Sequence, residues 1–263
     1  EDFALSDKRE AAQPIGPANM HTLYDQAIAL FAEAESIASA AGNTNVRLAA
    51  IALTARAHYA KALWQMLNAG GTPAQPLISV ATADAAASQL IALAPADWRY
   101  EVSFSPTSPY NPACTDDGIL YQDPIDGIPD PALKRIVYDF IEDIQYSSQT
   151  VIGVREMRLI LAESALQQGD TDGFVTQINE VRALEGLTDY DPDVHAITPR
   201  DMLIHTRLVN LFLQPMRRLA DMYRFGIPSP TWVESSEAAT QPGTVFPISD
   251  EERLANCYFN GTC

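Results

Sequence analysis

The stretch that decides the fold runs from residue 155 to residue 187 and reads REMRLILAESALQQGDTDGFVTQINEVRALEGL. Apolar residues recur every three or four positions in both halves, which is the spacing of a buried helical face. Gly169-Asp170 separates the halves and predicts a turn. Small and large residues also follow the spacing of a tetratricopeptide repeat, at Ala162, Ala165, Gly169, Phe174, Ile178 and Val181. We therefore expect a helical hairpin that packs against neighbouring hairpins.

Three further helices are expected on the N-terminal side, over residues 21–40, 46–69 and 81–95. The first carries an apolar stripe that we expect to be buried, formed by Leu23, Ala27, Leu30, Phe31, Ala34 and Ile37. The third should be capped by Thr82 or Asp84 and end at Pro95. The region 48–95 is a looser version of the hairpin pattern.

Helical periodicity also returns over 131–146 and over 198–226. Thr198 should cap the latter helix, and Pro215 should break it before a second short helix over 216–225. Arg218, Asp221 and Arg224 recur every three residues there, so one carboxylate can bridge two guanidinium groups in a structural ion network.

Residues 96–130 lack this periodicity and are rich in proline and aspartate, which excludes a regular helix or a central strand. Aromatic residues within this segment favour an ordered loop that packs or binds. The predicted fold is all-α, with tetratricopeptide-like hairpins in one compact domain over residues 1–263. Residues 1–20 form an extended lead-in to this domain.

The charge composition of the chain argues against several classes of function. The 263 residues carry a formal net charge of −17, which opposes binding to nucleic acid and to anionic lipid. No apolar run approaches the roughly 20 residues of a spanning helix. Four scattered histidines and the absence of known catalytic fingerprints predict a protein that is not an enzyme, with no catalytic residues. His58 and His205 fall inside expected helices, where a histidine usually packs.

The Asp-Gly turns at 115–118, 123–127 and 170–173 lack the ligand pattern of a calcium loop, so we expect neither a metal nor a cofactor. Cys257 and Cys263 enclose five residues that contain Asn-Gly, and a small disulfide loop between them is feasible. Pairing with Cys114 or three free thiols are the open alternatives.

Several of these motifs occur together in a familiar order. The segments EMRLILAESALQQGD, INEVRALEGL, LIHTRLVNLFLQPMRRLADMYRFG and FPISDEERLAN resemble the C-terminal half of the SusD/RagB-like family of outer-membrane nutrient-binding lipoproteins. The N-terminal segment LYDQAIALFAEAESIA and the later RLAAIALTARAHYAKAL are similar to the first repeat helices of that family. The chain departs from the family pattern at His205 and at Gln214-Pro215, and it is shorter than most members.

The resemblance implies a lipid-anchored protein on the extracellular face of the outer membrane. Such a protein would capture an oligosaccharide or peptide and pass it to a SusC-like TonB-dependent transporter as its partner. The lipidated cysteine would precede Glu1, and an exported location would favour the disulfide.

Carbohydrate capture uses flat aromatic rings surrounded by polar groups. The candidate ligand-binding residues are Trp98, Tyr100, Tyr110, Tyr121 and Trp232. Each of them could instead pin its loop to the core. The main alternative function is a helical-repeat scaffold that binds a protein and has no nutrient ligand, and a weaker alternative is a small glycan hydrolase.

Overall fold

The computed structural model describes residues 15–68, 72–102, 122–133, 135, 148–212, 214 and 217–227. This part of the chain is mostly helical, which confirms the predicted all-α class. In chain order the elements are η1 (Pro17–Asn19), α1 (His21–Ala40), α2 (Thr44–Asn68), α3 (Ala81–Leu93), β1 (Arg99–Val102), β2 (Gln149–Gly153), α5 (Val154–Gln168), α6 (Thr171–Ala183), α7 (Pro199–Asn210) and α8 (Arg217–Phe225).

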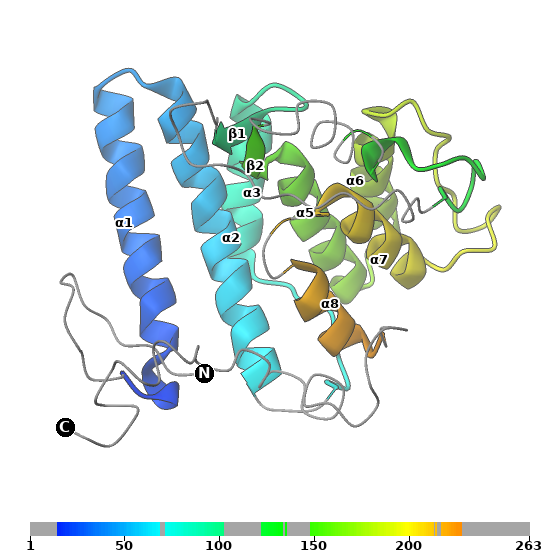
Figure 1. Cartoon of the computed structure of the whole chain (residues 1–263), viewed down its shortest axis with the longest axis horizontal. Coiled ribbons are helices and arrows are strands. Elements are labelled where there is room, and N and C mark those ends of the chain that lie inside the picture. The colour runs from blue at the N-terminus through cyan, green and yellow to red at the C-terminus, as the bar shows by residue number, and fades with distance from the viewer. Residues whose placement is uncertain are drawn as a thin grey trace.

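The helices pack as a continuous series. α1 and α2 form a long pair on one side of the molecule, and α5 to α8 gather on the other side of α2 (Figure 1). α3 packs against both α2 and α5 and so joins the two groups. No helix in the described part of the chain is long and apolar enough to span a bilayer.

α5 lies at the centre of the fold and is buried on more than one face. Met157 and Ile160 belong to a core cluster shared with α2 and α3, whereas Leu159 and Ala162 belong to a second cluster with α6 and α7. Because neighbours surround α5, three of its charged residues are buried too, namely Arg155, Glu156 and Glu163. Each of these buried charges needs a partner of opposite charge or a hydrogen bond within the interior.

The predicted hairpin is confirmed as α5 and α6. Gly169 ends α5 with φ of 78°, a left-handed conformation that glycine adopts without a steric penalty. The Asp170 carboxylate then caps α6 by accepting the backbone N–H of Gly173 at 2.9 Å. Phe174 and Ile178 are completely buried against α5 and α7, as their spacing predicts.

The helix expected over 81–95 runs from Ala81 to Leu93, and the predicted cap is wrong. Val80 occupies the cap position and makes no capping bond through its side chain. The Asp84 carboxylate instead accepts a hydrogen bond from the Ser164 hydroxyl of α5 at 2.6 Å. The helix stops before Pro95 because the residue preceding a proline disfavours the helical conformation.

The predicted buried stripe of α1 is also partly wrong. Leu30 and Ile37 are 63% and 61% exposed, while Ala38 is buried. α2 is the main neighbour of α1 in the described structure, so the contact covers only part of the wide apolar stripe. Phe31 and Ala34 lie on the half-buried side.

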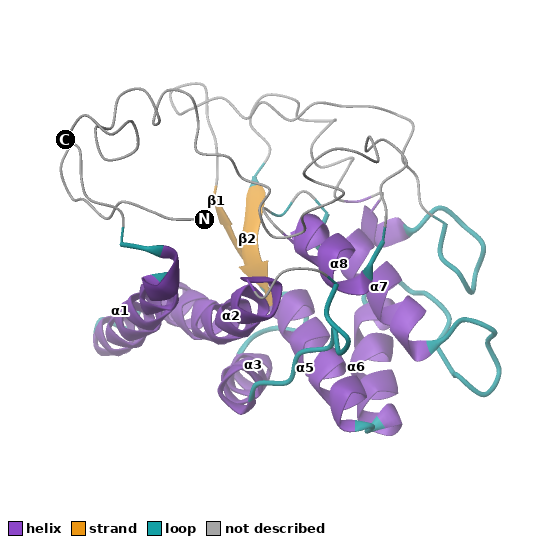
Figure 2. Cartoon of the chain, turned by 90° about the horizontal axis from the view of Figure 1, so that it is seen from below, coloured by secondary structure: helices purple, strands orange, loops and turns teal. Residues whose placement is uncertain are grey.

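A short antiparallel sheet was not predicted. β1 pairs with β2 beside the first half of α2, with an irregularity between Tyr100 and Glu101 (Figure 2). A four-residue strand at the edge of a proline-rich segment is too short to show a period of two. The sheet fixes the start of the segment over 96–130 against the core.

The C-terminal helices follow the sequence closely. Thr198 caps α7, because its hydroxyl oxygen accepts the backbone N–H of Asp201 at 3.1 Å. α8 begins at Arg217, close to the predicted start, and Gly226 follows it with φ of 66°. Pro215 lies outside the described residues, as do most of the residues of the helix expected over 131–146.

Candidate functional site

A buried ion cluster joins α2, α5, α7 and α8. Glu163 lies at its centre and accepts hydrogen bonds from the Tyr59 hydroxyl at 2.7 Å and from the backbone N–H of Ile78 at 2.8 Å. Arg224 also donates to this carboxylate, at 3.1 Å from Nη2 to Oε2. Each side chain in the cluster is therefore paired on several sides, as a buried charge requires.

Asp221 completes the cluster by bridging two arginines. Its carboxylate accepts from Arg207 Nε at 2.9 Å and from Arg224 Nη2 at 2.7 Å. Burial alone would raise the pKa of Asp221, but the charges of Arg207 and Arg224 outweigh it and lower that pKa. Burial raises the pKa of Tyr59, so its hydroxyl remains a neutral donor. The cluster thus holds the fold together and presents no reactive atom to solvent.

The prediction that one carboxylate bridges two guanidinium groups is therefore confirmed, but one of the two predicted arginines is wrong. Asp221 and Arg224 pair as predicted, but the second guanidinium on Asp221 belongs to Arg207 of α7. Arg218 is half-buried on α8, and the described ion pairs of Asp221 do not include it. The side chain of Asp221 faces α7, and only the tertiary structure could reveal that neighbour.

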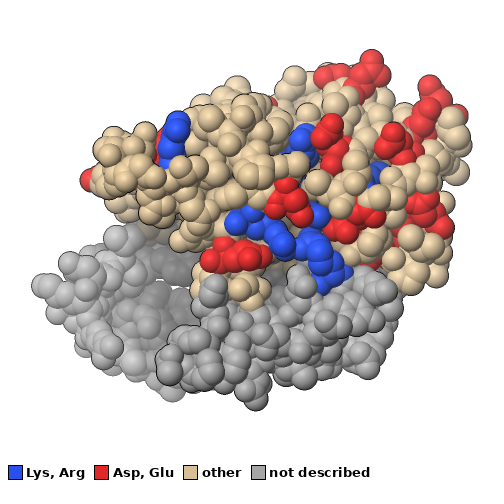
Figure 3. Space-filling model, turned by 90° about the horizontal axis from the view of Figure 1, so that it is seen from above, with Lys and Arg blue, Asp and Glu red and all other residues tan. Residues whose placement is uncertain are grey.

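A second charged group lies where α2 meets the start of α5 and α8. The Arg56 guanidinium donates to both oxygens of Glu156, with Nε 2.9 Å from Oε1, and Arg217 Nε lies 3.4 Å from Oε1. Burial disfavours the charge of Glu156, but Arg56 and Arg217 outweigh it and lower the pKa to about 2. Figure 3 shows basic and acidic side chains side by side on the face seen from above.

The aromatic candidates Trp98 and Tyr100 lie two residues apart, at the start of the sheet. Both are half-buried and pack against the same core cluster. The Trp98 indole N–H donates to the Asn45 side chain at 3.0 Å. The structure therefore brings these two together and pins them to the core while leaving part of each accessible.

The other predicted ligand-binding residues, Tyr110, Tyr121 and Trp232, lie outside the described residues. The same is true of Cys114 and of the predicted Cys257–Cys263 disulfide. These predictions therefore stay predictions.

Residues 122–133 dock onto α6 and α7 through two buried aspartates. Arg182 donates to both oxygens of Asp123, at 2.6 and 3.0 Å. Asp130 accepts from the backbone N–H of Ala132 at 2.9 Å, and its Oδ2 lies 2.9 Å from Nε2 of His205. The C-terminal end of the proline-rich segment is thus fixed to α6 and α7, as its start is fixed by the sheet.

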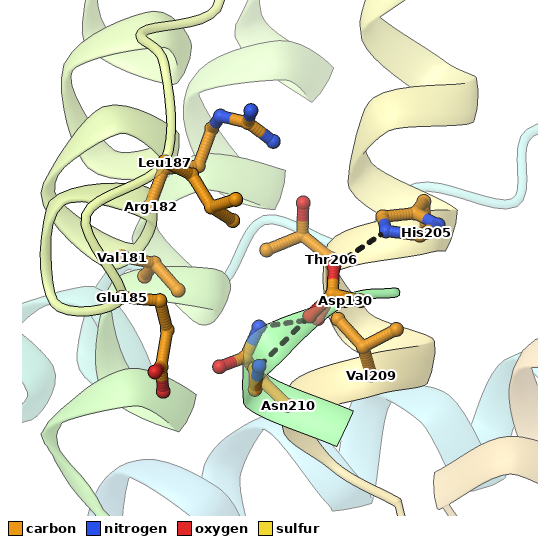
Figure 4. Close-up of a pocket in the computed structure, with 10 residues that line it drawn as sticks. Asp130, Val181, Arg182, Glu185, Leu187, His205, Thr206, Val209 and Asn210 are labelled. Atoms are coloured by element: carbon orange, nitrogen blue, oxygen red, sulfur yellow. Dashed lines mark hydrogen bonds and ion pairs between the residues drawn. The ribbon is translucent and has the colours of Figure 1, made fainter. Parts of the chain in front are cut away.

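A small cleft with a cavity volume of about 10 Å³ lies beside this contact, between α6 and α7 (Figure 4). Its polar lining comprises Asp130, Arg182, Glu185, His205, Thr206 and Asn210. The space is too small for a sugar ring and suits a water molecule.

Asp123, Asp130 and His205 also place possible metal-ligand atoms within 4.8 Å of one another. Both carboxylates already accept several hydrogen bonds, and Arg182 neutralises Asp123. A metal ion there would face that guanidinium directly. The arrangement therefore fits a docking contact better than a metal centre.

The sequence did not identify Tyr59, Glu163 and Arg207 as members of one cluster. Glu163 interrupts an apolar run in LILAESAL, and Arg207 does the same in LIHTRLVNL. A charge on a buried helical face is a usable signal, because it requires a partner. The identity of that partner depends on the packing.

Comparison with known proteins gave no match to a family model, to a curated protein or to a solved structure.

Proposed function

We propose that the chain is a cell-surface nutrient-binding protein. It captures an oligosaccharide or a peptide and passes it to its partner, a SusC-like TonB-dependent transporter in the outer membrane. A lipid anchor holds the protein on the extracellular face of that membrane. The protein itself catalyses no reaction in this proposal.

One observation supports the proposal above the others. The segments that carry the SusD-like resemblance are far apart in the sequence, yet they meet in the buried ion cluster. Tyr59 comes from the N-terminal segment, Glu163 from the first helix of the hairpin, and Arg224 from the last helix. Side chains from three of the resembling segments thus contact one another in one buried cluster, which favours a common scaffold over a chance likeness of separate motifs.

The ligand surface is proposed to include Trp98 and Tyr100. Both rings stand at the start of the proline-rich segment, and acidic and basic side chains flank them at Asp97, Arg99 and Glu101. A half-buried ring with a fixed edge offers an apolar surface for a sugar face, and the neighbouring charges can bond hydroxyl groups.

Calorimetry with panels of oligosaccharides and peptides tests the proposal. We expect one class to bind the wild-type chain, and Trp98→Ala together with Tyr100→Ala to weaken that binding at least about tenfold. Tyr24→Ala is the matched control, because Tyr24 packs against Trp64 on α1 and α2, remote in sequence from the sheet. Turnover of a glycan by the pure protein, or equal binding by both variants, would contradict the proposal.

A protein-binding scaffold is the second candidate, and the outer face of α1 favours it. Leu30 and Ile37 are large, exposed and seven residues apart, so they lie on one side of the helix. If the scaffold function is correct, Leu30→Ser with Ile37→Ser will abolish binding of a protein partner, and the wild-type chain will bind no glycan.

A further inference from the structure

Trp98 is held in place through both its side chain and its backbone. Its indole N–H donates to Asn45, and its backbone carbonyl accepts the N–H of Val154 at 3.0 Å. A Cβ added at Gly153 would lie 2.8 Å from that carbonyl oxygen, so the two backbones touch. The backbone at the start of α5 therefore contacts the backbone of Trp98 directly.

The preceding residue, Asp97, is also held by α5. Arg155 donates to both of its carboxylate oxygens, with Nε 2.7 Å from Oδ1 and Nη2 3.0 Å from Oδ2. The pairing is bidentate, so it fixes the orientation of Asp97 as well as its position. Because Asp97 directly precedes Trp98 in the chain, the Arg155 guanidinium also restricts where the indole of Trp98 can lie.

The same guanidinium reaches the cleft between α6 and α7. Arg155 Nη1 donates to Glu185 at 2.6 Å and to Asn210 at 3.0 Å, and both of these residues line the cleft. Arg155 is 6% exposed, so its donors are committed to these three partners. The buried side chain of Arg155 thus links Asp97, which precedes Trp98 at the start of the sheet, to the C-terminal ends of α6 and α7.

We propose that Arg155 is a positioning residue, which holds the Trp98 ring in the orientation that a sugar face stacks on and couples this ring to the cleft. Its relevance to ligand capture rests on the proposed nutrient-binding function. The positioning itself does not, because it can be measured on Trp98 without any ligand. Arginine is required here, since lysine cannot bond two carboxylate oxygens and two further acceptors at once.

The electrostatics agree with this arrangement. Burial alone would raise the pKa of Asp97, but hydrogen bonds and charge from Arg155 outweigh it and lower that pKa. Burial would lower the pKa of Arg155, and the charges of Asp97 and Glu185 raise it instead. Both groups therefore stay ionised around neutral pH.

The test uses Trp98 as a single fluorescent reporter, in a background with Trp64→Phe and Trp232→Phe, because the chain has three tryptophans. In this background Arg155→Lys should raise the acrylamide quenching constant of Trp98 about twofold, since the residue opens more often. Arg158→Lys is the matched control. Arg158 lies on the same helix and also bonds α6, through Glu180 and Gln177, but it makes no bond to Asp97.

A double-mutant cycle separates positioning from a general loss of stability. Asp97→Ala should raise the quenching constant as much as Arg155→Lys does, and the double variant should show no further rise. Asp97 is partly exposed, so Asp97→Ala keeps the test valid even where Arg155→Lys fails to fold. Unchanged quenching in both single variants, additive effects, or an equal rise in Arg158→Lys would overturn the proposal.

A second measurement adds the ligand. Once calorimetry has identified a bound glycan, Arg155→Lys should weaken its binding, and Arg158→Lys should leave it unchanged. Absence of any glycan binding by the wild-type chain would contradict the proposed function, while the quenching result would still decide whether Arg155 positions Trp98.

Discussion

Arg224 and Glu163 form an ion pair from which solvent is completely excluded, although 61 residues separate them in the chain. The pair is surrounded by Tyr59, Arg207 and Asp221, so each charge has partners on several sides. Isolated ions would be very costly in this position, and the network is what makes their burial tolerable. The first prediction concerns its central member.

Glu163→Ala should lower the free energy of unfolding by about 3–5 kcal/mol, because it leaves two buried guanidinium groups with one carboxylate between them. Urea denaturation followed by circular dichroism measures the change. Glu180→Ala is the control. Glu180 also pairs with an arginine, but its side chain is 54% exposed, so its loss should cost less than about 1 kcal/mol. Equal losses in the two variants would show that burial of the pair is unimportant.

The stability of the protein should fall in acid because of Glu156. Its pKa is lowered to about 2 in the folded state, so the carboxylate contributes stability above its ordinary pKa and loses it as pH falls through the folded value. The loss should amount to about 3 kcal/mol between about pH 5 and pH 2. Denaturation curves at several pH values measure it. In Glu156→Gln the difference between the ends of this range should shrink by that amount, and an unchanged slope would refute the assignment.

Gly153→Ala should destabilise the protein by about 1–3 kcal/mol, because the new methyl group would press against the backbone oxygen of Trp98. The backbone conformation of Gly153 is extended, so the cost is purely steric. Thermal unfolding measures the effect, and Thr150→Ala in the same strand is the control. If Trp98 fluorescence and the melting temperature both remained at their wild-type values, the close contact between β2 and Trp98 would be disproved.

Leu30→Ser should change the free energy of unfolding by less than about 0.5 kcal/mol, since the side chain is mostly exposed. Leu159→Ala should cost about 2–5 kcal/mol, because Leu159 is completely buried between α5 and its neighbours. Both residues occupy apolar helical stripes in the sequence. Comparable losses for the two variants would mean that the outer face of α1 is covered in solution.

The hairpin at residues 155–187 was predictable because its signals are local. A helix terminates at Gly169 and restarts at Asp170 through interactions with residues no more than five positions away. The cap of α7 at Thr198 has the same origin. Such features depend on neighbours along the chain, so a sequence contains all the information they need.

The cap of α3 shows where this reasoning fails. Thr82 and Asp84 both suit a cap, but Asp84 bonds Ser164 of a distant helix instead. Leu30 fails for the opposite reason, since its stripe is wide and the neighbouring helix covers only part of it. In both cases a residue has two possible environments, and contacts with distant segments select one of them.

The sequence by itself therefore determined the helical class, the position of the turns and the presence of charged residues on buried helical faces, because these depend on spacing and on nearby residues. The tertiary structure alone decided that Arg207 replaces Arg218 beside Asp221, and that Arg155 joins Asp97 to Glu185 and Asn210. A buried charge requires a partner wherever the chain supplies one, and only the packing of the helices brings the two side chains within reach.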